Sequence, residues 1–157
     1  MIEALAPFCS LISHSEGTDR YPDPYRVCFE GKHTIVSFAD HPAVTGEWLG
    51  ESLDFLGPQY AGLKSTAAGR YQINKPAWLE GQGQLQLPDF TPASQDAWTA
   101  WRLKRAGALP FIESGDITGA IYACRNIWAS LPGSTAGQPT AQLSALLEFY
   151  NQQETLA

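Results

Sequence analysis

Apolar residues recur at helical spacing at the start of the chain. Five of them share one face of a helix that this pattern predicts over residues 2–15. Pro7 interrupts the stretch, and because proline is tolerated in the first turn of a helix, we expect the regular part to begin near it. The residues of the inner face are Leu5, Phe8, Cys9, Leu11 and Ile12.

The same periodicity returns in the second half of the chain. It predicts helices over 94–106, 117–128 and 140–151, with a short helical or turn segment over 107–112. Asp116 is positioned to cap the second of these helices. The residues expected to face inward are Ala97, Trp98, Trp101, Leu103, Ile117, Ala120, Ile121, Cys124, Ile127, Trp128, Leu143, Leu146, Leu147 and Tyr150.

The segment between the first helix and the later ones is rich in β-prone and turn-forming residues. Residues 19–25 contain two prolines and two aspartates and are predicted to form a loop. Residues 26–29 and 34–38 are predicted to pair as a hairpin around a turn at 30–32. The next segment, 43–63, has apolar residues without a clear period and supports no assignment.

A polar stretch then precedes a Gly/Gln/Pro-rich connection over 81–92. Its first hydroxyl residues are placed to cap a helix that runs to about Leu79. Small residues at 67–69 would let another backbone or a ligand come close. An ordinary helix start explains the stretch equally well. The polar or stacking side chains that it would offer to a ligand are Ser65, Thr66, Arg70, Tyr71 and Gln72.

These elements together predict a mainly helical α+β fold with one small antiparallel sheet. The 157 residues suit a single domain over 1–157, with a helical lobe and a sheet lobe. Hydrophobic residues make up 44% of the chain and charged residues only 17%, which is typical of a globular protein. The net charge of −6 without a basic run argues against nucleic acid or an acidic membrane surface as a partner. A polymer would be gripped by hydrogen bonds and by stacking on aromatic rings.

The cysteines and histidines show no metal-binding pattern. Three cysteines are an odd number, and no Cys/His spacing typical of zinc occurs, so we expect reduced, buried thiols and no metal or cofactor. The N-terminal residues carry no positive region, and Pro7 and Ser10 break their apolar run. Neither a signal peptide nor a transmembrane span is therefore predicted.

Glu16 is the candidate for acid catalysis. It stands at the end of the first predicted helix, directly before Gly17. The negative end of the helix dipole and partial burial would both favour its protonated form, as a general acid requires. A surface glutamate before a glycine C-cap is the ordinary alternative. Asp40, in Asp40-His41-Pro42, is either a second carboxylate near the site or a turn former, and its residue type favours the turn.

Nine short motifs, in order along nearly the whole chain, resemble the lambda-phage-type lytic transglycosylases, the endolysins of glycoside hydrolase family 104. They are SEGTD at 15–19, DHP at 40–42, LKST at 63–66, AGRYQ at 68–72, DF at 89–90, SQDA at 94–97, RAGALP at 105–110, SGDI at 114–117 and NIWASLPG at 126–133.

The resemblance implies a lysozyme-like fold of two lobes and cleavage of the β-1,4 bond between N-acetylmuramic acid and N-acetylglucosamine in peptidoglycan, leaving a 1,6-anhydromuramic end. It places the single catalytic acid at Glu16. It also implies that Tyr71 and Gln72 face the sugars, because the GRYQ run is similar to a Gly-x-x-Gln element of wider lytic transglycosylases. The residues expected to contact substrate are Asp40, Ser65, Thr66, Arg70, Tyr71, Gln72 and Trp128, the last of which borders the cleft or lies in the core.

The biology that the resemblance implies is release of a phage from its host. Glycan strands are the expected partner and the monomer the expected state. An enzyme without a signal peptide would stay in the cytoplasm until a holin-like pore let it reach the wall. Local wall opening by a phage tail or secretion apparatus would use the same chemistry.

The chain departs from the family at two places. The loop after Leu131-Pro132-Gly133 lacks the aromatic residue that related enzymes carry near Ala136, and residues 43–62 do not align clearly. Two alternatives therefore remain beside the transglycosylase. One is a hydrolase of the same bond that uses Asp40 as base, and the other is a non-catalytic wall-binding protein.

Overall fold

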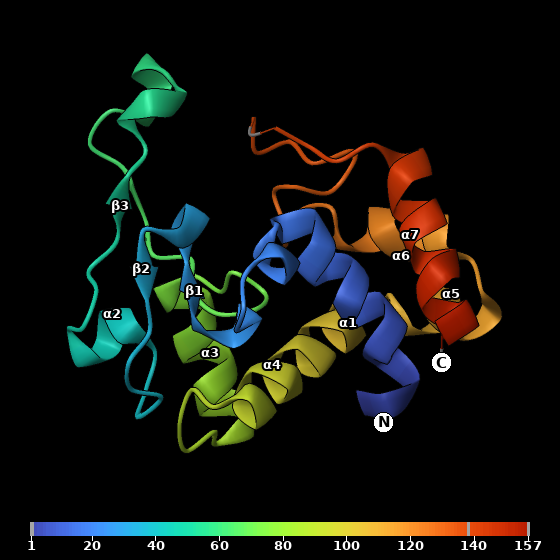
Figure 1. The fold of residues 1–157 in the computed structure, drawn as a ribbon, viewed down its shortest axis with the longest axis horizontal. Helices are drawn as coiled ribbons and strands as arrows, with labels where there is room; N and C mark the ends of the chain where they lie inside the picture. Colours follow the sequence, from blue (N-terminus) through green and yellow to red (C-terminus); the bar gives the residue numbers. More distant parts are fainter. Residues whose placement is uncertain (1, 138, 157) are drawn as a thin grey trace. The chain divides into compact units, whose positions relative to one another are not determined.

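The computed structural model describes residues 2–137 and 139–156 (Figure 1). Backbone contacts divide the chain into two compact units. One unit is formed by the residues up to Gly17 together with those from Thr99 onward, and the other by Thr18–Trp98. The expected mainly helical α+β fold with small antiparallel sheets is confirmed. The single functional domain over 1–157 stays a prediction.

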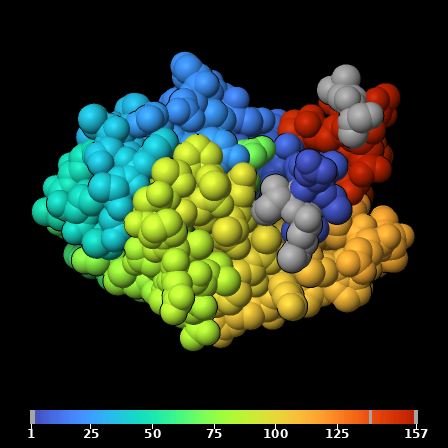
Figure 2. Space-filling model, turned by 90° about the horizontal axis from the view of Figure 1, so that it is seen from below, coloured from blue at the N-terminus to red at the C-terminus, as the bar shows by residue number. Residues whose placement is uncertain are grey.

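The first unit is helical. Its core lies where α1 packs on α7 and where α6 contacts α5 and α7, and Figure 2 shows α7 in red beside α1 in dark blue. Helix α4 starts in the second unit and ends in this one. The helices are α1 (Ile2–Glu16), α4 (Pro92–Arg105), α5 (Leu109–Ser114), α6 (Ile117–Cys124) and α7 (Leu143–Leu156).

The predicted faces of these helices are largely buried, but several predicted boundaries differ from the structure. Helix α7 spans Leu143–Leu156 rather than 140–151. Helix α1 begins at Ile2, as its predicted range 2–15 has it, but it contains Pro7 in its interior, whereas the regular part was expected to begin near this proline. The proline leaves the carbonyl of Glu3 without its helical donor, and this residue is exposed, so water can satisfy it. Helix α6 ends at Cys124, four residues before the predicted end. Asp116 caps it as expected, since its Oδ1 accepts a hydrogen bond from the Gly119 amide.

The second unit contains two hairpins of two residues per strand. The expected hairpin forms and pairs Val27 with Thr34, but its second strand is His33–Thr34 rather than 34–38. A second hairpin, which the sequence did not reveal, pairs Glu51 with Ser65. The second hairpin carries two 3₁₀ turns at its tip, Asp54–Leu56 and Pro58–Tyr60 (Figure 1). The elements of this unit are β1 (Val27–Cys28), β2 (His33–Thr34), α2 (Pro42–Thr45), β3 (Glu51–Ser52), β4 (Lys64–Ser65) and α3 (Lys75–Leu85).

The helix predicted from Ser65 to Leu79 is wrong. Ser65 ends strand β4, and helix α3 begins only at Lys75 and continues to Leu85, into the predicted connection. Between them Ala68 pairs with Ile73 across a tight turn. Thr66 does support a helix start, because its hydroxyl accepts the Lys75 amide at 2.9 Å. The cap therefore comes from nine residues upstream rather than from the adjoining residue.

The three cysteines, Cys9, Cys28 and Cys124, are buried free thiols, as predicted. Burial raises the pKa of Cys28 and of Cys124 to about 12. Within residues 2–137 and 139–156, no helix is long and apolar enough to cross a membrane.

Candidate active site

Glu16 is the last residue of α1. Gly17 follows in the left-handed region with φ of 79°, and its amide donates to the His14 carbonyl at 3.1 Å. This is the glycine C-cap predicted from the sequence. The glutamate is therefore fixed to a rigid helix end, and part of its surface stays exposed.

The Glu16 carboxyl accepts a hydrogen bond from a distant hydroxyl. Ser130 Oγ donates to Glu16 Oε1 at 3.1 Å and lies 2.7 Å from Ser15 Oγ. Ser130 belongs to the turn after α6. This turn is anchored by Trp128 and Leu131, whose side chains are buried. Its carbonyl also accepts the Ala141 amide at 2.7 Å. All of these groups belong to the first unit.

The pKa of Glu16 is raised from 4.5 to about 7. Burial is the main cause, because it disfavours the charged carboxylate, while the Ser130 hydrogen bond acts in the opposite direction. Burial alone explains a raised pKa, so no second carboxylate has to be invoked. A carboxyl with this pKa can hold a proton near neutral pH and release it to a leaving group.

Asp40 has a structural role in the second unit. Its Oδ1 accepts hydrogen bonds from the His41 amide at 2.7 Å, from Trp78 Nε1 at 2.9 Å and from Gln82 Nε2 at 3.2 Å. The carboxylate thus joins the segment before α2 to helix α3. This agrees with the turn-forming interpretation and extends it, because two of the three donors come from α3.

The motif 69–72 forms the tight turn that Ala68 and Ile73 close. Gly69 and Gln72 both have positive φ, at 79° and 50°. The Gln72 amide nitrogen donates inward, to the carbonyls of Val27 at 2.9 Å and of Gly69 at 2.8 Å. These bonds stabilise the left-handed conformation of a residue that is not glycine.

A second set of contacts fixes the middle of this turn. Arg70 Nη1 donates to the hydroxyls of Tyr25 at 3.0 Å and Tyr71 at 3.1 Å, and both hydroxyls donate to Asp96. Gln95 accepts the Arg70 amide at 3.0 Å. The predicted polar residues Arg70, Tyr71 and Gln72 are therefore brought together, and each has protein partners.

Of the other residues predicted to contact substrate, Ser65 and Thr66 have hydroxyls with a proton to donate, whereas Tyr71 and Trp128 are buried. Ser65 and Thr66 each accept a backbone amide, those of Ala67 and Lys75, so their hydroxyl protons can be donated to another acceptor. The rings of Tyr71 and Trp128 are 1% and 2% exposed. Stacking on a sugar requires an exposed ring face, so in this structure both rings serve as core. For Trp128 this favours a place in the core over a place at the border of the cleft.

Sequence reasoning missed Ser130, which donates to the candidate acid, and Ser15, whose hydroxyl contacts Ser130. Both lie in motifs that carry the family resemblance, SEGTD and NIWASLPG, but nothing local marks Ser130 as a partner of a residue 114 positions away. Its position between a buried tryptophan and a buried leucine is the signal that could have suggested an inward hydroxyl.

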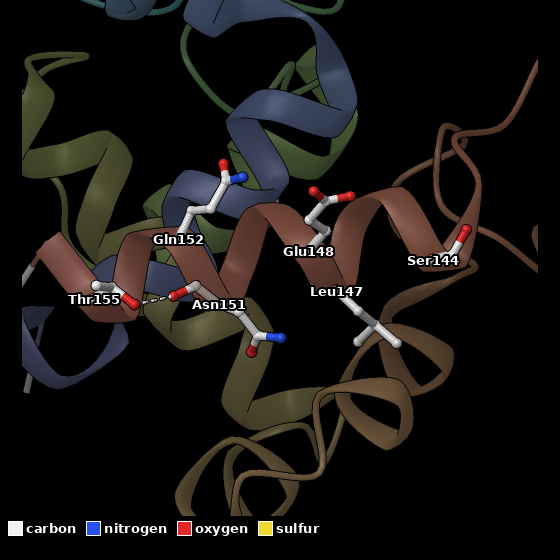
Figure 3. A pocket seen from close by; sticks show the side chains of 6 residues that line it. All are labelled: Ser144, Leu147, Glu148, Asn151, Gln152 and Thr155. Carbon is white, nitrogen blue, oxygen red and sulfur yellow. Dashed lines mark hydrogen bonds between the residues drawn. The ribbon is translucent and has the colours of Figure 1, made fainter.

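Two further features lie outside this site. The exposed face of α7 lines a shallow hollow, and Figure 3 shows Glu148 and Gln152 pointing to one side while Leu147 and Asn151 point to the other. These side chains do not converge on a ligand. Within the part of the chain that the structure describes, no group of three or more His, Cys, Asp or Glu residues could hold a metal ion.

Comparisons with known proteins agree with this arrangement. The family model named Endolysin matches residues 6–156. The endolysin of Escherichia phage lambda is 38% identical over 149 residues, which cover 92% of this chain and 87% of that protein. The endolysin of Escherichia phage P2 is 38% identical over 154 residues, covering 93% and 90%.

Solved structures give the same result. Bacteriophage lambda lysozyme complexed with a chitohexasaccharide matches with a TM-score of 0.81 and 36% identity, covering 96% of this chain and 94% of that one. A second structure of lysozyme from bacteriophage lambda matches with a TM-score of 0.77, again at 36% identity, covering 95% and 92%. The chain therefore belongs to the endolysin family and is a lysozyme-like, peptidoglycan-degrading phage enzyme.

Proposed function

We propose that the enzyme is a lytic transglycosylase that cleaves the β-1,4 bond between N-acetylmuramic acid and N-acetylglucosamine. Glu16 is its single catalytic acid and base. The observation that carries the proposal is the Glu16 carboxyl at the end of α1, which burial keeps protonated up to about pH 7.

The reaction needs only this carboxyl group. Protonated Glu16 gives its proton to the glycosidic oxygen, and the electron pair of the breaking C1–O bond goes to that oxygen. The carboxylate then accepts the proton of the C6 hydroxyl of the same muramic residue, whose oxygen bonds to C1. Glu16 ends as it began, protonated, and no water is consumed.

The structural role of Asp40 favours this chemistry over hydrolysis. Hydrolases of this kind use a second carboxylate to activate water or to attack the sugar. Asp40 was the candidate for that role, but its Oδ1 already accepts three hydrogen bonds within the second unit. A carboxylate whose oxygen is held by three protein donors has less freedom to orient a water molecule.

Glycan strands are the proposed substrate of this chain. The solved lambda lysozyme complex holds a chitohexasaccharide, and we extend glycan binding from that protein to this one. Ser65 and Thr66 are the proposed donors to acetamido oxygens, because each hydroxyl keeps a proton to donate. Arg70 and Gln72 would contribute through the turn that they hold rather than through free donors.

The biological role that we propose is lysis of the host wall at the end of phage growth. The enzyme would act as a monomer that a holin-like pore releases to the wall. The family resemblance places Asp40, Tyr71 and Trp128 near substrate. Asp40 and Tyr71 would then act by supporting the fold of the second unit, and Trp128 by supporting that of the first.

Mass spectrometry of muropeptides released from purified peptidoglycan tests the proposal. We expect products with 1,6-anhydro ends, lighter by one water molecule than reducing-end products. The variant Glu16→Gln should release nothing while it keeps its circular dichroism spectrum, and Glu113→Gln, which removes an exposed carboxylate of α5, is the matched control. Reducing-end products would establish hydrolysis instead, and no release by the folded wild-type enzyme would favour a wall-binding protein.

A further inference from the structure

Ser130 lies between the candidate acid and a second hydroxyl. Its Oγ is 3.1 Å from Glu16 Oε1 and 2.7 Å from Ser15 Oγ. Ser15 comes from α1 and Ser130 from the turn after α6, so the three groups meet only in the folded first unit. Both contacts are partly buried, which limits competition from solvent.

The hydrogens of this group can be placed in two ways. A hydroxyl has one hydrogen to donate and two lone pairs that accept. If Ser130 donates to Glu16 Oε1, its hydrogen is used, and Ser15 must donate to Ser130. If instead Glu16 donated from Oε1 to Ser130, the acid proton would be held in a protein hydrogen bond and withheld from the substrate.

We propose that Ser15 and Ser130 form a positioning pair that directs the acid proton of Glu16 to Oε2. Ser15 donates to Ser130, and Ser130 donates to Oε1. Oε1 is then an acceptor in both protonation states, so the proton of the neutral acid resides on Oε2, where no bond to this pair withholds it from the substrate. This inference rests on the proposed role of Glu16 as the acid.

The pair also stabilises the product of proton transfer. When Glu16 becomes a carboxylate, the bond from Ser130 becomes charge-assisted and strengthens. An interaction that strengthens as charge develops lowers the barrier, because it favours the transition state over the ground state. The hydroxyl thereby offsets part of the desolvation that raises the pKa of Glu16.

Besides Glu16, the histidine and carboxyl side chains in the last turn of α1 and in α7 are exposed. His14, two residues before Glu16 on α1, is exposed and stacks on Phe149 of α7 with ring centroids 4.0 Å apart. The α7 carboxyls Glu148 and Glu154 are also exposed, and Glu154 accepts the hydroxyl of Tyr150. The causes of the Glu16 pKa shift are burial and Ser130, so a change at Ser130 is expected to appear directly in the titration of Glu16.

The pH dependence of turnover on purified peptidoglycan tests the pair. Ser130→Ala should lower kcat about tenfold, leave KM nearly unchanged and move the alkaline limb of the profile up by about one pH unit. Ser15→Ala should shift it in the same direction by less. The double variant should match Ser130→Ala alone, since Ser15 acts through Ser130.

A second measurement and three further variants complete the test. The ¹³C shift of the Glu16 carboxyl carbon reports its titration even in an inactive variant. Ser130→Thr keeps the hydroxyl and should restore the wild-type profile, while Ser114→Ala, at an exposed serine of α5, should leave it unchanged. If Ser130→Ala folds but neither the alkaline limb of its pH profile nor the titration of Glu16 shifts, the proposed role of Ser15 and Ser130 is wrong, while Glu16 can still be the acid. Additive effects of the two substitutions in the double variant would have the same meaning. An active Glu16→Gln variant would overturn both.

Discussion

Burial of the Glu16 carboxyl makes the stability of the protein depend on pH. Its pKa rises from 4.5 to about 7 on folding, so the folded state holds this proton more tightly than the unfolded chain. Below pH 4.5 the Glu16 carboxyl is protonated in both the folded and the unfolded state, so its raised pKa does not lower the free energy of unfolding. As pH rises from there to 7, the unfolded chain loses its proton first and stability falls. The loss is at most about 3 kcal/mol, and solvent access to the partly exposed residue reduces it.

We predict that Glu16→Gln is more stable than the wild type in alkaline solution. The amide cannot ionise, so the variant lacks the loss that the wild type suffers between pH 4.5 and 7. Urea unfolding at pH 5 and pH 8 measures the difference, which should change by about 2–3 kcal/mol in favour of the variant. Glu113→Gln is the control, and an equal change there would mean that burial of Glu16 is not the cause.

We predict that Gly69→Ala is strongly destabilising. Gly69 has φ of 79°, and a β-carbon there would lie 2.2 Å from Gln95 Oε1. Gln95 is fully buried and holds three backbone groups, so it cannot move aside. The expected loss of unfolding free energy is about 3 kcal/mol or more. Gly62→Ala is the matched control, because Gly62 has φ of 77° with open space around it, and its loss should be about 1 kcal/mol.

At the scale of elements, Glu47 organises the segment between β2 and α2. Its carboxylate contacts His33 Nε2 at 2.6 Å and accepts the amides of Val36 at 2.8 Å and Ser37 at 3.0 Å. Desolvation alone would raise its pKa, but these hydrogen bonds together outweigh desolvation and lower it. The stability that Glu47 contributes is therefore present above pH 4.5 and is lost as pH falls through the folded pKa.

We predict that Glu47→Gln destabilises the protein at neutral pH by about 1–2 kcal/mol, because a neutral amide oxygen is a weaker acceptor than a carboxylate. The difference from the wild type should shrink as pH falls through the folded pKa of Glu47, because the carboxylate becomes protonated. Thermal unfolding over a series of pH values from 7 downward measures it. Glu30→Gln, at an exposed position of a neighbouring turn, is the control, and a difference that does not shrink over the series would argue against this account.

The sequence predicted the elements that local patterns determine. Periodic apolar faces located α1, α4, α6 and α7, and Asp116 was correctly assigned as a cap. Elements that depend on distant groups were missed. Thr66 caps α3 across nine residues, and the turn before it forms because Cys28, in β1, pairs with Ala68. No local pattern contains that information.

The hairpin of β3 and β4 could not be predicted for a related reason. Each strand has only two residues, and the connection contains two 3₁₀ turns rather than a two-residue turn. Alternation over two residues carries almost no signal. Within the candidate site, Glu16 was predictable because its helix end and glycine cap are local, whereas its partner Ser130 was not.

At the scale of the whole molecule, the two units share helix α4, which runs through their boundary between Trp98 and Thr99. Melting of either unit would remove packing from one end of a continuous helix. We therefore expect the units to unfold in one cooperative transition.

The buried thiols report on this transition. Cys28 belongs to the second unit, and Cys9 and Cys124 belong to the first. We predict that all three resist alkylation in the native enzyme and become labelled over the same range of guanidinium concentration, as peptide mass spectrometry would measure. Labelling of Cys28 well before the other two would show instead that the units unfold independently.

The close approach of Gly69 to Gln95 has an evolutionary consequence. The amide of Gln95 donates to the carbonyls of Tyr25 and Phe90 while it accepts the Arg70 amide, and it can do so only because position 69 has no side chain. Neither position can drift alone without losing these bonds or creating a clash. We therefore expect positions 69 and 95 to change together rather than singly, and a designer who wishes to alter the turn must redesign both.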